Sequence, residues 1–576
     1  MRTTDLTPQT RQHALDQMAS GQPLDILVIG GGITGAGIAL DAATRGLRTG
    51  VVEAQDWAGG TSRWSSKLVH GGLRYLQQLD FKLVAEALSE RERLLYTLAP
   101  HLVKPVPFLY PITRRVWERP YVTAGIGLYD TLAHLGSKVA SMPFHRHLSQ
   151  RGVSKAFPSI KPGAMVGAVK YWDGRVDDAR LVMTLIRTAV GYGALAASRT
   201  RVTGLLKNDD GHVTGAQVTD LETNTSFDIH AKKVITATGV WTEQTQDMAQ
   251  TDGGLKVLAS KGIHIVVPRE RIHGEVGLIL QTEKSVLFVI PWEHYWIIGT
   301  TDTPYEQDIA APVATGADID YVIEHANVVL DEPLTRDDVI GTFAGLRPLL
   351  QPGVKNGAET ASTKVSREHT VAEVVPGLIA IAGGKLTTYR VMAEDAVDFA
   401  LGAQRAKELP SVTDRTLLQG ADGYLPLTRQ VGQIAAAHGW DDDTVTHLLN
   451  RYGSGISEIE ALVAEQPDLA QPLTGAPEYL RAEVVQAARH EGVLHLEDLF
   501  ETRTRMTYDQ PDHGLAAVEE VADLLAQELG WDPSRRTREI QDYRTRCAAE
   551  DAAALTTDDV AAAAERAAAP SLTDLD

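Results

Sequence analysis

A short apolar run followed at once by glycines is the feature that most constrains the fold of this chain. Residues 24–29 (Leu-Asp-Ile-Leu-Val-Ile) are too few for a helix and predict a buried parallel strand. A G-x-G-x-x-G pattern follows, formed by Gly30, Gly32 and Gly35. Residues 35–45 are expected to form a helix and residues 49–53 a second strand. This order predicts a βαβ unit and an α/β architecture.

The three glycines have separate physical roles in such a unit. One makes the tight turn, one lets the backbone approach a pyrophosphate, and one lets the helix pack closely on the strand. The helix N-terminus adds free N–H groups and a partial positive charge. Glu53 ends the second strand, where an acidic side chain accepts hydrogen bonds from an adenosine ribose. The sequence therefore predicts a dinucleotide site.

The rest of the chain favours FAD over NAD as that dinucleotide. The glycine fingerprint is not repeated in the long sequence that follows it. A further strand candidate, residues 233–237, leads into Ala237-Thr238-Gly239. In two-domain flavoproteins a strand end of this kind returns to the first nucleotide-binding unit. Either motif alone is weak, but together they favour FAD.

Length and composition indicate a globular protein of several domains. The chain has 576 residues, enough for two to four domains, with 43% hydrophobic and 23% charged residues. Further strands are expected at 262–268 and in a hairpin of 286–291 with 295–300. Beyond about residue 410 the segments are helix-forming. The Ala-rich tail, 548–576, is expected to be a marginal helix or disordered, and to carry no chemistry.

Charge and cysteine content exclude several classes of function. The net charge of -20 argues against a nucleic-acid binder, which needs a basic face. The single cysteine, Cys547, lies far from every motif, so we expect no disulfide framework, no cysteine metal site and a reducing cytoplasm. We predict no metal. The first 23 residues lack an apolar signal core, and no apolar run is long enough to span a bilayer. Any membrane contact is therefore expected to be peripheral.

Residues 61–76 form the most specific stretch of the chain. Their sequence, Thr-Ser-Arg-Trp-Ser-Ser-Lys-Leu-Val-His-Gly-Gly-Leu-Arg-Tyr-Leu, resembles the signature of the FAD-dependent glycerol-3-phosphate dehydrogenases, T-S-x-x-S-S-K-L-(I/V)-H-G-G-L-R-Y-L. Four further segments agree and follow the family's order: 172–181, 261–268, 298–302 and 383–390. The resemblance covers roughly residues 24 to 400, and the region up to 545 is similar in helical character only.

The resemblance implies a fold of three parts. These are a Rossmann-type FAD-binding domain of the glutathione-reductase kind, a β-rich substrate cap and a C-terminal helical domain. The expected bounds are 1–23 for an N-terminal segment; 24–80, 150–260 and 355–405 for the FAD-binding domain; 81–149 and 261–354 for the cap; 410–545 for the helical domain; and 546–576 for the tail.

The activity implied by the resemblance is oxidation of glycerol 3-phosphate to dihydroxyacetone phosphate, with transfer of the C2 hydride to flavin N5. The electrons would pass to a quinone or another respiratory acceptor. Oxidising a secondary alcohol needs a base for the hydroxyl proton and a hydride acceptor close to the carbon. A phosphate dianion needs cations, preferably arginine forks. Negative charge on the reduced flavin is stabilised by a lysine or a helix N-terminus.

The sequence offers candidates for each of these roles. Arg347 and Arg367 match the family's substrate-binding arginines, and the proline after Arg347 restricts its backbone to an extended shape. His264, in an apolar strand, is the first candidate for the general base, and His70 is its rival. Lys385 precedes a loop-to-helix start that is expected to face the flavin pyrimidine ring.

Two more candidates, Arg74 and Tyr75, lie on the substrate side of the 61–76 loop. Without the resemblance, Arg347, Arg367 and Lys385 are compatible with solvated positions and His264 with a core position. Arg74 and Tyr75 are equally compatible with packing against the helix that apolar spacing predicts over residues 80–99. The expected cofactor contacts lie in the glycine- and hydroxyl-rich loops. They are Gly30, Gly32, Gly35, Glu53, Thr61, Ser62, Ser65, Ser66, Lys67, His70, Gly71, Gly239, Trp241, Gly384, Lys385, Leu386 and Thr387.

The resemblance also suggests where such a protein works. Members of the family are peripheral enzymes that feed quinones, so we expect a cytoplasmic protein on the inner face of the cell membrane, as a homodimer. Two basic segments, 114–119 and 535–538, suit an anionic lipid surface, although each also resembles a solvated face.

Three alternatives remain open at this point. An oxidase would pass electrons to O2, and the lack of a long insertion between the cap strands favours a dehydrogenase. A related amine oxidase is disfavoured by the Ser-Ser-Lys-Leu-Val-His-Gly-Gly loop. A flavin-binding scaffold would have no turnover at all.

Overall fold

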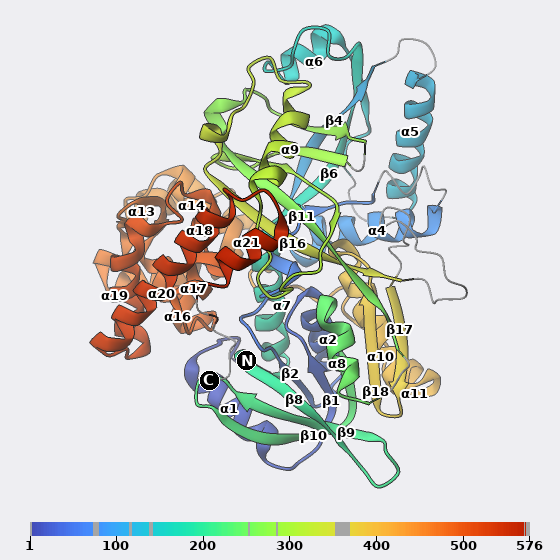
Figure 1. The fold of residues 1–576 in the computed structure, drawn as a ribbon, viewed down its shortest axis with the longest axis vertical. Coiled ribbons are helices and arrows are strands. Elements are labelled where there is room, and N and C mark those ends of the chain that lie inside the picture. Colours follow the sequence, from blue (N-terminus) through green and yellow to red (C-terminus); the bar gives the residue numbers. More distant parts are fainter. Residues whose placement is uncertain are drawn as a thin grey trace.

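The computed structural model describes residues 3–72, 80–113, 118–136, 142–250, 254–283, 286–351, 369–569 and 571. Two large sheets and a group of helices make up the molecule (Figure 1). In Figure 1 one sheet lies at the bottom, the second rises above it, and the C-terminal helices, coloured orange to red, lie to one side of both.

The lower sheet has eight strands and contains the predicted βαβ unit. Its main path runs β17-β18-β10-β1-β2-β7, and β8 and β9 extend β10 as an antiparallel arm. The strands are β1 (Leu24–Ile29), β2 (Thr49–Val52), β7 (Leu195–Ala197), β8 (Thr200–Lys207), β9 (Val213–Asp220), β10 (Thr225–Thr236), β17 (His369–Val375) and β18 (Leu378–Gly383). β1 pairs in parallel with both β2 and β10. The strand–helix–strand prediction is therefore confirmed, with its helix, α2 (Ile33–Thr44), starting at the fingerprint itself.

The upper sheet has ten strands and corresponds to the predicted cap. Its path is β15-β11-β14-β13-β12-β4-β6-β3, with β16 on β11 and β5 on β6. The strands are β3 (Leu68–Val69), β4 (Val103–Ile112), β5 (Arg146–Ser149), β6 (Gly167–Val176), β11 (Val257–Pro268), β12 (Gly277–Gln281), β13 (Val286–Pro291), β14 (Tyr295–Gly299), β15 (Thr303–Pro304) and β16 (Gly341–Leu350). The predicted hairpin is present as β13 and β14.

One predicted domain boundary needs correction. The range 150–260 placed residues 167–176 in the FAD-binding domain, but these residues form β6, which pairs with β4 along its whole length. The chain returns to the lower domain only at α7 (Asp178–Gly191), a helix that packs against α2. Sequence periodicity could not reveal this, because a strand looks the same whichever sheet it joins.

Helices cover both sheets. Besides α2 and α7, the helices before residue 410 are α1 (Pro8–Ala19), α4 (Phe81–Arg93), α5 (Glu118–Gly136), α6 (Gln150–Ala156), α8 (Thr242–Asp247), α9 (Gly316–Asn327), α10 (Tyr389–Leu401) and α11 (Ala403–Glu408). The helix expected at 80–99 is α4, which is capped by Asp80. It continues from Leu94 to Leu98 as a π-helix. No helix in the described part of the chain is long and apolar enough to cross a bilayer.

The C-terminal region is helical, as predicted, and its last part is folded. Its elements are α12 (Tyr424–Leu427), α13 (Val431–His438), α14 (Asp442–Tyr452), α15 (Ile456–Glu465), the short hairpin β19 (Pro472–Leu473) with β20 (Ala476–Leu480), α16 (Arg481–His490), α17 (Leu496–Asp498), α18 (Met506–Asp509), α19 (Val518–Leu529), α20 (Pro533–Ala553) and α21 (Asp559–Arg566). α20 runs across the boundary expected at 545, and its Cys547 is buried. Of the two states expected for the tail, the described residues show the helical one.

Two of the three arginines in the basic segment 535–538 pair with acidic side chains. Arg536 pairs with Asp523 at 2.6 Å and Glu519 at 2.8 Å. Arg535 lies 3.5 Å from Glu539. Their charges are thus largely engaged within the helical domain. Residues 114–117 of the other basic segment lie outside the described residues.

Buried ion pairs join the helical domain to the lower domain. Arg180 of α7 donates two hydrogen bonds to Glu491, at 2.6 and 2.7 Å, and both side chains are almost fully buried. Arg503 pairs in the same way with Asp56, which follows β2. Beside Arg180, the pKa of Glu491 falls to about 2 although burial alone would raise it. A buried charge is tolerated only when it is paired, so these contacts fix the two domains together.

Replacing Arg180 by Met should leave Glu491 as an uncompensated buried charge. We expect the free energy of unfolding, measured by urea denaturation, to fall by about 3–5 kcal/mol. The matched control is Arg489→Met, which removes a pair with Glu528 whose arginine is 35% exposed and should cost about 1 kcal/mol or less. Equal losses for the two variants would contradict this account of the domain contact.

Candidate functional site

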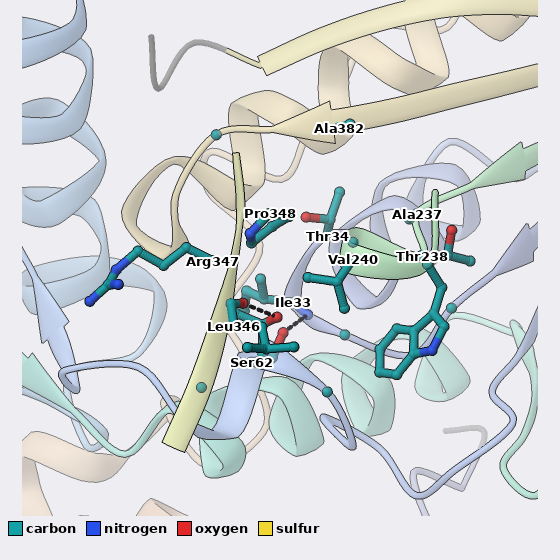
Figure 2. A pocket seen from close by; sticks show the side chains of 18 of the residues that line it. Ile33, Thr34, Ser62, Ala237, Thr238, Val240, Leu346, Arg347, Pro348 and Ala382 are labelled. Carbon is teal, nitrogen blue, oxygen red and sulfur yellow. Dashed lines mark hydrogen bonds between the residues drawn. The ribbon is translucent and has the colours of Figure 1, made fainter. Parts of the chain in front are cut away.

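A cavity of about 620 Å³ lies between the two sheets. It opens at the carboxyl ends of β1 and β2, the usual ligand position in parallel α/β sheets. Its other wall comes from β11, β16 and the loop after β18. Figure 2 shows Arg347 extending to one end of this pocket, away from Ala237, Thr238 and Val240. The cavity is therefore long, with a nucleotide-facing end and a cationic end.

The fingerprint glycines shape the first end. Gly30 has a φ of +111°, and a Cβ there would lie 2.7 Å from the carbonyl oxygen of Ala237. A Cβ on Gly35 would lie 1.8 Å from the carbonyl oxygen of Gly30, so only glycine lets α2 sit this close to β1. Gly32 caps α2 without a side-chain hydrogen bond. The first residues of α2 line the cavity, and a helix N-terminus in this position suits a pyrophosphate.

Glu53 lines the cavity next to these glycines. Its carboxylate accepts hydrogen bonds from the backbone N–H of Gly31 at 2.6 Å and of Gln55 at 2.7 Å. Burial raises its pKa, whereas these two amides lower it. A carboxylate has further lone pairs, so Glu53 retains capacity to accept from a ribose hydroxyl.

The 61–71 loop supplies hydroxyls to the cavity wall. Thr61 donates to the carbonyl of Leu346 at 2.6 Å, which ties the loop to β16, and Ser62 accepts from the N–H of Ile33 at 2.9 Å (Figure 2). Ser65 donates to Asp178 at 2.7 Å. These serine and threonine residues all line the cavity.

Two predicted cofactor contacts in this loop lie behind the cavity wall. The ammonium of Lys67 is buried, 2.6 Å from Asp178 and 2.9 Å from the carbonyl of Arg63. Gly71 packs where a Cβ would meet Leu88 and Tyr129. Neither residue belongs to the cavity lining, nor does Gly35. Lys67 and Gly71 shape the loop that does line it, and Gly35 lets α2 pack closely on β1.

His264 of β11 lies at the cationic end. Its Nε2 is 2.9 Å from the hydroxyl oxygen of Ser66, and its ring stacks on Phe343 of β16 with centroids 4.7 Å apart. Its Nδ1 is buried and has no hydrogen-bond partner within the described residues. Burial, and then the charges of Arg347 and Lys67, hold the pKa of His264 well below 6.5. The imidazole is therefore neutral at physiological pH, so one of its ring nitrogens is unprotonated and acts as a hydrogen-bond acceptor.

Arg347 of β16 lies on the same face of the sheet. Its guanidinium donates to the hydroxyl of Thr300 and the carbonyl of Thr301, both at 2.9 Å, and lies 3.5 Å from Asp302. The neighbouring strand position is Gly262, where a Cβ would lie only 2.2 Å from the guanidinium. The arginine is thus held in one orientation with its charge in the cavity.

The loop after β18 closes the pocket. Gly384 has a φ of +75°, and a Cβ there would lie 2.4 Å from the sulfur of Met392. Lys385 then precedes a short helical turn, Leu386–Thr388. The hydroxyl oxygen of Thr387 accepts from the N–H of His70 at 3.1 Å, which joins this loop to the 61–71 loop. Lys385 and His70 both line the cavity.

Most predicted site residues therefore meet in one cavity. Those in its lining are Gly30, Gly32, Glu53, Thr61, Ser62, Ser65, Ser66, His70, Gly239, Trp241, His264, Arg347, Gly384, Lys385, Leu386 and Thr387. Arg74, Tyr75 and Arg367 lie outside the described residues.

Sequence reasoning missed other residues of this site. Thr300 and Asp302, which hold Arg347, and Asp178, which holds Ser65 and Lys67, all lie in segments that match the family, so that match was an available signal. Thr200 and Val202 line the nucleotide end from β8, and their strand has no distinguishing pattern.

Comparison with known proteins gives a consistent family assignment. Residues 25–390 match the model of the FAD dependent oxidoreductase family, and residues 411–536 match the C-terminal domain of alpha-glycerophosphate oxidase. A glycerol-3-phosphate dehydrogenase of Mycobacterium leprae (strain TN) is 49% identical over 98% of this chain and 95% of that protein. The mitochondrial glycerol-3-phosphate dehydrogenase of Homo sapiens is 35% identical, over 93% of this chain and 75% of that protein.

A solved structure is similar over nearly the whole chain. It is a glycerol-3-phosphate dehydrogenase from Bacillus halodurans complexed with FAD, with a TM-score of 0.75 and 30% identity. The similarity covers 94% of this chain and 98% of that one. All three parts of the fold are thus shared.

The low pKa of His264 leads to a direct test by NMR. A group with a lowered pKa stays neutral as pH falls until that lowered value is reached, so the His264 ring should not titrate between about pH 8 and 6.5. Histidine-selective labelling, with His264→Asn to assign the signal, measures this. A resonance of His264 that titrates at 6.5 or above would contradict the account.

Proposed function

The chain belongs to the FAD-dependent oxidoreductase family, and we propose that it oxidises sn-glycerol 3-phosphate to dihydroxyacetone phosphate. The observation that carries the proposal is the cationic end of the cavity, where His264 and Arg347 lie on one sheet face beside the loops of the nucleotide site. The named relatives, at up to 49% identity, support the same substrate.

The cavity fits FAD by several independent features. The glycine turn before α2 allows close approach of a pyrophosphate, Glu53 lies where a ribose is expected, and a second helical start follows Lys385. When bound, FAD supplies the hydride acceptor for the C2 hydrogen of the substrate. The residues proposed to hold it are the cavity-lining members of the fingerprint, of the 61–71 loop, of the 239–241 turn and of the 384–387 loop.

Arg347 is proposed to bind the substrate phosphate. Its guanidinium is oriented by Thr300, Thr301 and Asp302, so little further ordering is needed when the anion binds. A planar guanidinium matches two phosphate oxygens at once. Arg367 is proposed as the second phosphate ligand, and Arg74 and Tyr75 as further substrate contacts.

His264 is proposed as the base that takes the C2 hydroxyl proton. Ser66 and Phe343 hold its ring, and burial keeps it neutral in the free protein. A phosphate dianion at Arg347 would offset the positive field that lowers the pKa of His264, so the base becomes stronger once the substrate is bound. His70 is the alternative base. Lys385 is proposed to stabilise negative charge on the reduced flavin.

We also propose that the electrons pass to a quinone on the inner face of the cell membrane, with the protein as a homodimer. Exposed apolar side chains support membrane contact. Leu128 of α5 is 38% exposed and Phe144 is 54% exposed. A lipid surface would cover such side chains, and the arginines of 114–119 would meet anionic headgroups.

An oxidase that uses O2 is the second candidate, and it is favoured by the match of residues 411–536 to an oxidase C-terminal domain. The two acceptors are separated by the yield of hydrogen peroxide per substrate oxidised. A yield near zero in air, with rapid reduction of a soluble quinone, supports the dehydrogenase. A stoichiometric yield supports the oxidase.

Arg347→Ala should lower kcat/KM for glycerol 3-phosphate by about 10- to 100-fold, because a charge-assisted contact worth roughly 1.5–3 kcal/mol is lost. FAD content, read from the flavin-to-protein absorbance ratio, should not change. Arg336→Ala is the control, since this cap-domain arginine is 44% exposed and pairs with Asp320 instead. Unchanged kinetics in Arg347→Ala would remove Arg347 from the substrate site.

A further inference from the structure

Lys261 is a charged residue on an otherwise apolar face of β11. Successive strand residues alternate in direction, so Ser260 and His264 face the cavity side whereas Lys261 and Ile263 face the other side. On that side Ile263 belongs to the apolar core packed beneath α9. Lys261 is only 1% exposed. A lysine buried to this extent requires anionic partners.

Two aspartates supply those partners, each from the first turn of a helix. Asp318 of α9 lies 2.6 Å from the Lys261 ammonium, and Asp559, the first residue of α21, forms the second ion pair. The same oxygen of Asp318 also accepts from the N–H and the hydroxyl of Thr315, at 3.1 and 2.9 Å. Asp318 is thus shared between Lys261 and its own helix cap, and Asp559 supplies the second carboxylate that the buried ammonium contacts.

Other contacts hold α21 in this place. The N–H of Gly316, at the start of α9, donates to the carbonyl of Thr556 at 2.8 Å. Val313, Ala553 and Ala562 form a small apolar cluster beside it. Figure 1 shows α21, in red, next to β11 and β16. The tail, which was expected to carry no chemistry, therefore contacts β11, the strand that contains His264.

On its cavity side, the same segment of β11 is connected to Arg347 by hydrogen bonds and an ion pair. Ser260, which precedes Lys261, is the register partner of Arg347 and donates a hydrogen bond to Asp302. Asp302 in turn lies 3.5 Å from the Arg347 guanidinium. Any shift of the backbone at residues 260–262 would therefore move the groups that orient Arg347.

We propose that Asp559 is a positioning residue for the substrate-phosphate site, acting through Lys261 to fix the β11 segment that orients Arg347. The inference rests on the proposed function of Arg347. Loosening that segment weakens an interaction made equally in the ground state and the transition state, so the expected signature is a higher KM with little change in kcat.

The test is steady-state kinetics of Asp559→Asn holoenzyme with glycerol 3-phosphate and a soluble quinone acceptor. We expect KM to rise by roughly 3- to 10-fold, kcat to stay within about 2-fold, and FAD content to be unchanged. Asp559→Glu, which keeps the charge, should restore part of the KM. Glu565→Gln is the matched control, since it removes an exposed carboxylate from the same helix and should leave KM unaltered.

A double variant tests whether the effect of Asp559 on KM passes through Lys261. In a Lys261→Met background the further change Asp559→Asn should add nothing to KM, because the partner is already absent. If the Lys261→Met protein does not fold, the three α21 variants decide alone. An unchanged KM in Asp559→Asn would overturn the proposal, as would an equal rise in Glu565→Gln. A wild-type protein that does not oxidise glycerol 3-phosphate would instead refute the proposed function, so the two failures are distinguishable.

Discussion

The antiparallel pairing of β11 with β16 is the constraint on which the site depends. It extends over the whole of β16 and sets Ser260 opposite Arg347, Gly262 opposite Gly345 and His264 opposite Phe343. A slip of one residue would send every one of these side chains to the other face. The two glycines in the middle leave room for the Arg347 guanidinium and for the backbone of Trp64, whose carbonyl oxygen would lie 2.5 Å from a Cβ on Gly345. His264, Arg347 and the 61–71 loop can therefore meet on one face only in this register.

Buried charges make the helical domain part of the same arrangement. Lys67, which contributes to the low pKa of His264, lies 5.3 Å from the ring centroid of Tyr508 in α18 and is paired with Asp178. Tyr508 also packs against Phe343, the residue on which His264 stacks. Asp178 belongs to α7 of the lower domain, whereas Tyr508 comes from the helical domain and contacts both Lys67 and Phe343. A movement of the helical domain would therefore disturb the packing behind His264. The C-terminal helices thus support the back of the cavity rather than forming an independent unit.

The sequence predicted the nucleotide half of the molecule well and the cap less well. The βαβ unit could be predicted because strand, glycines and helix are local signals with fixed spacing, and Gly30, Gly32 and Glu53 all line the cavity. His264 and Arg347 carry no local signal of their own, and only the family resemblance suggested them. The two side chains lie close together because β11 pairs with β16, a strand far away in the sequence. The hydrophobic periodicity of each strand does not show which strands pair.

Lys67 and Asp559 illustrate the remaining limit. Both lie outside the cavity lining, one in a loop assigned to cofactor contact and one in a tail assigned no chemistry. A charged residue in a sequence does not reveal whether it meets solvent, a ligand or a buried partner. That distinction comes from burial and from long-range ion pairs, and the structure alone supplies them.

The central claim is that a cavity holding FAD presents the flavin to an alcohol whose phosphate is bound at Arg347. Anaerobic mixing of the purified flavoprotein with glycerol 3-phosphate or with glycerol, followed by the visible absorbance of oxidised flavin, tests it most directly. The account predicts bleaching by glycerol 3-phosphate and none by the same concentration of glycerol, which lacks the phosphate. Failure of glycerol 3-phosphate to bleach the flavin, or equal bleaching by both compounds, would contradict it.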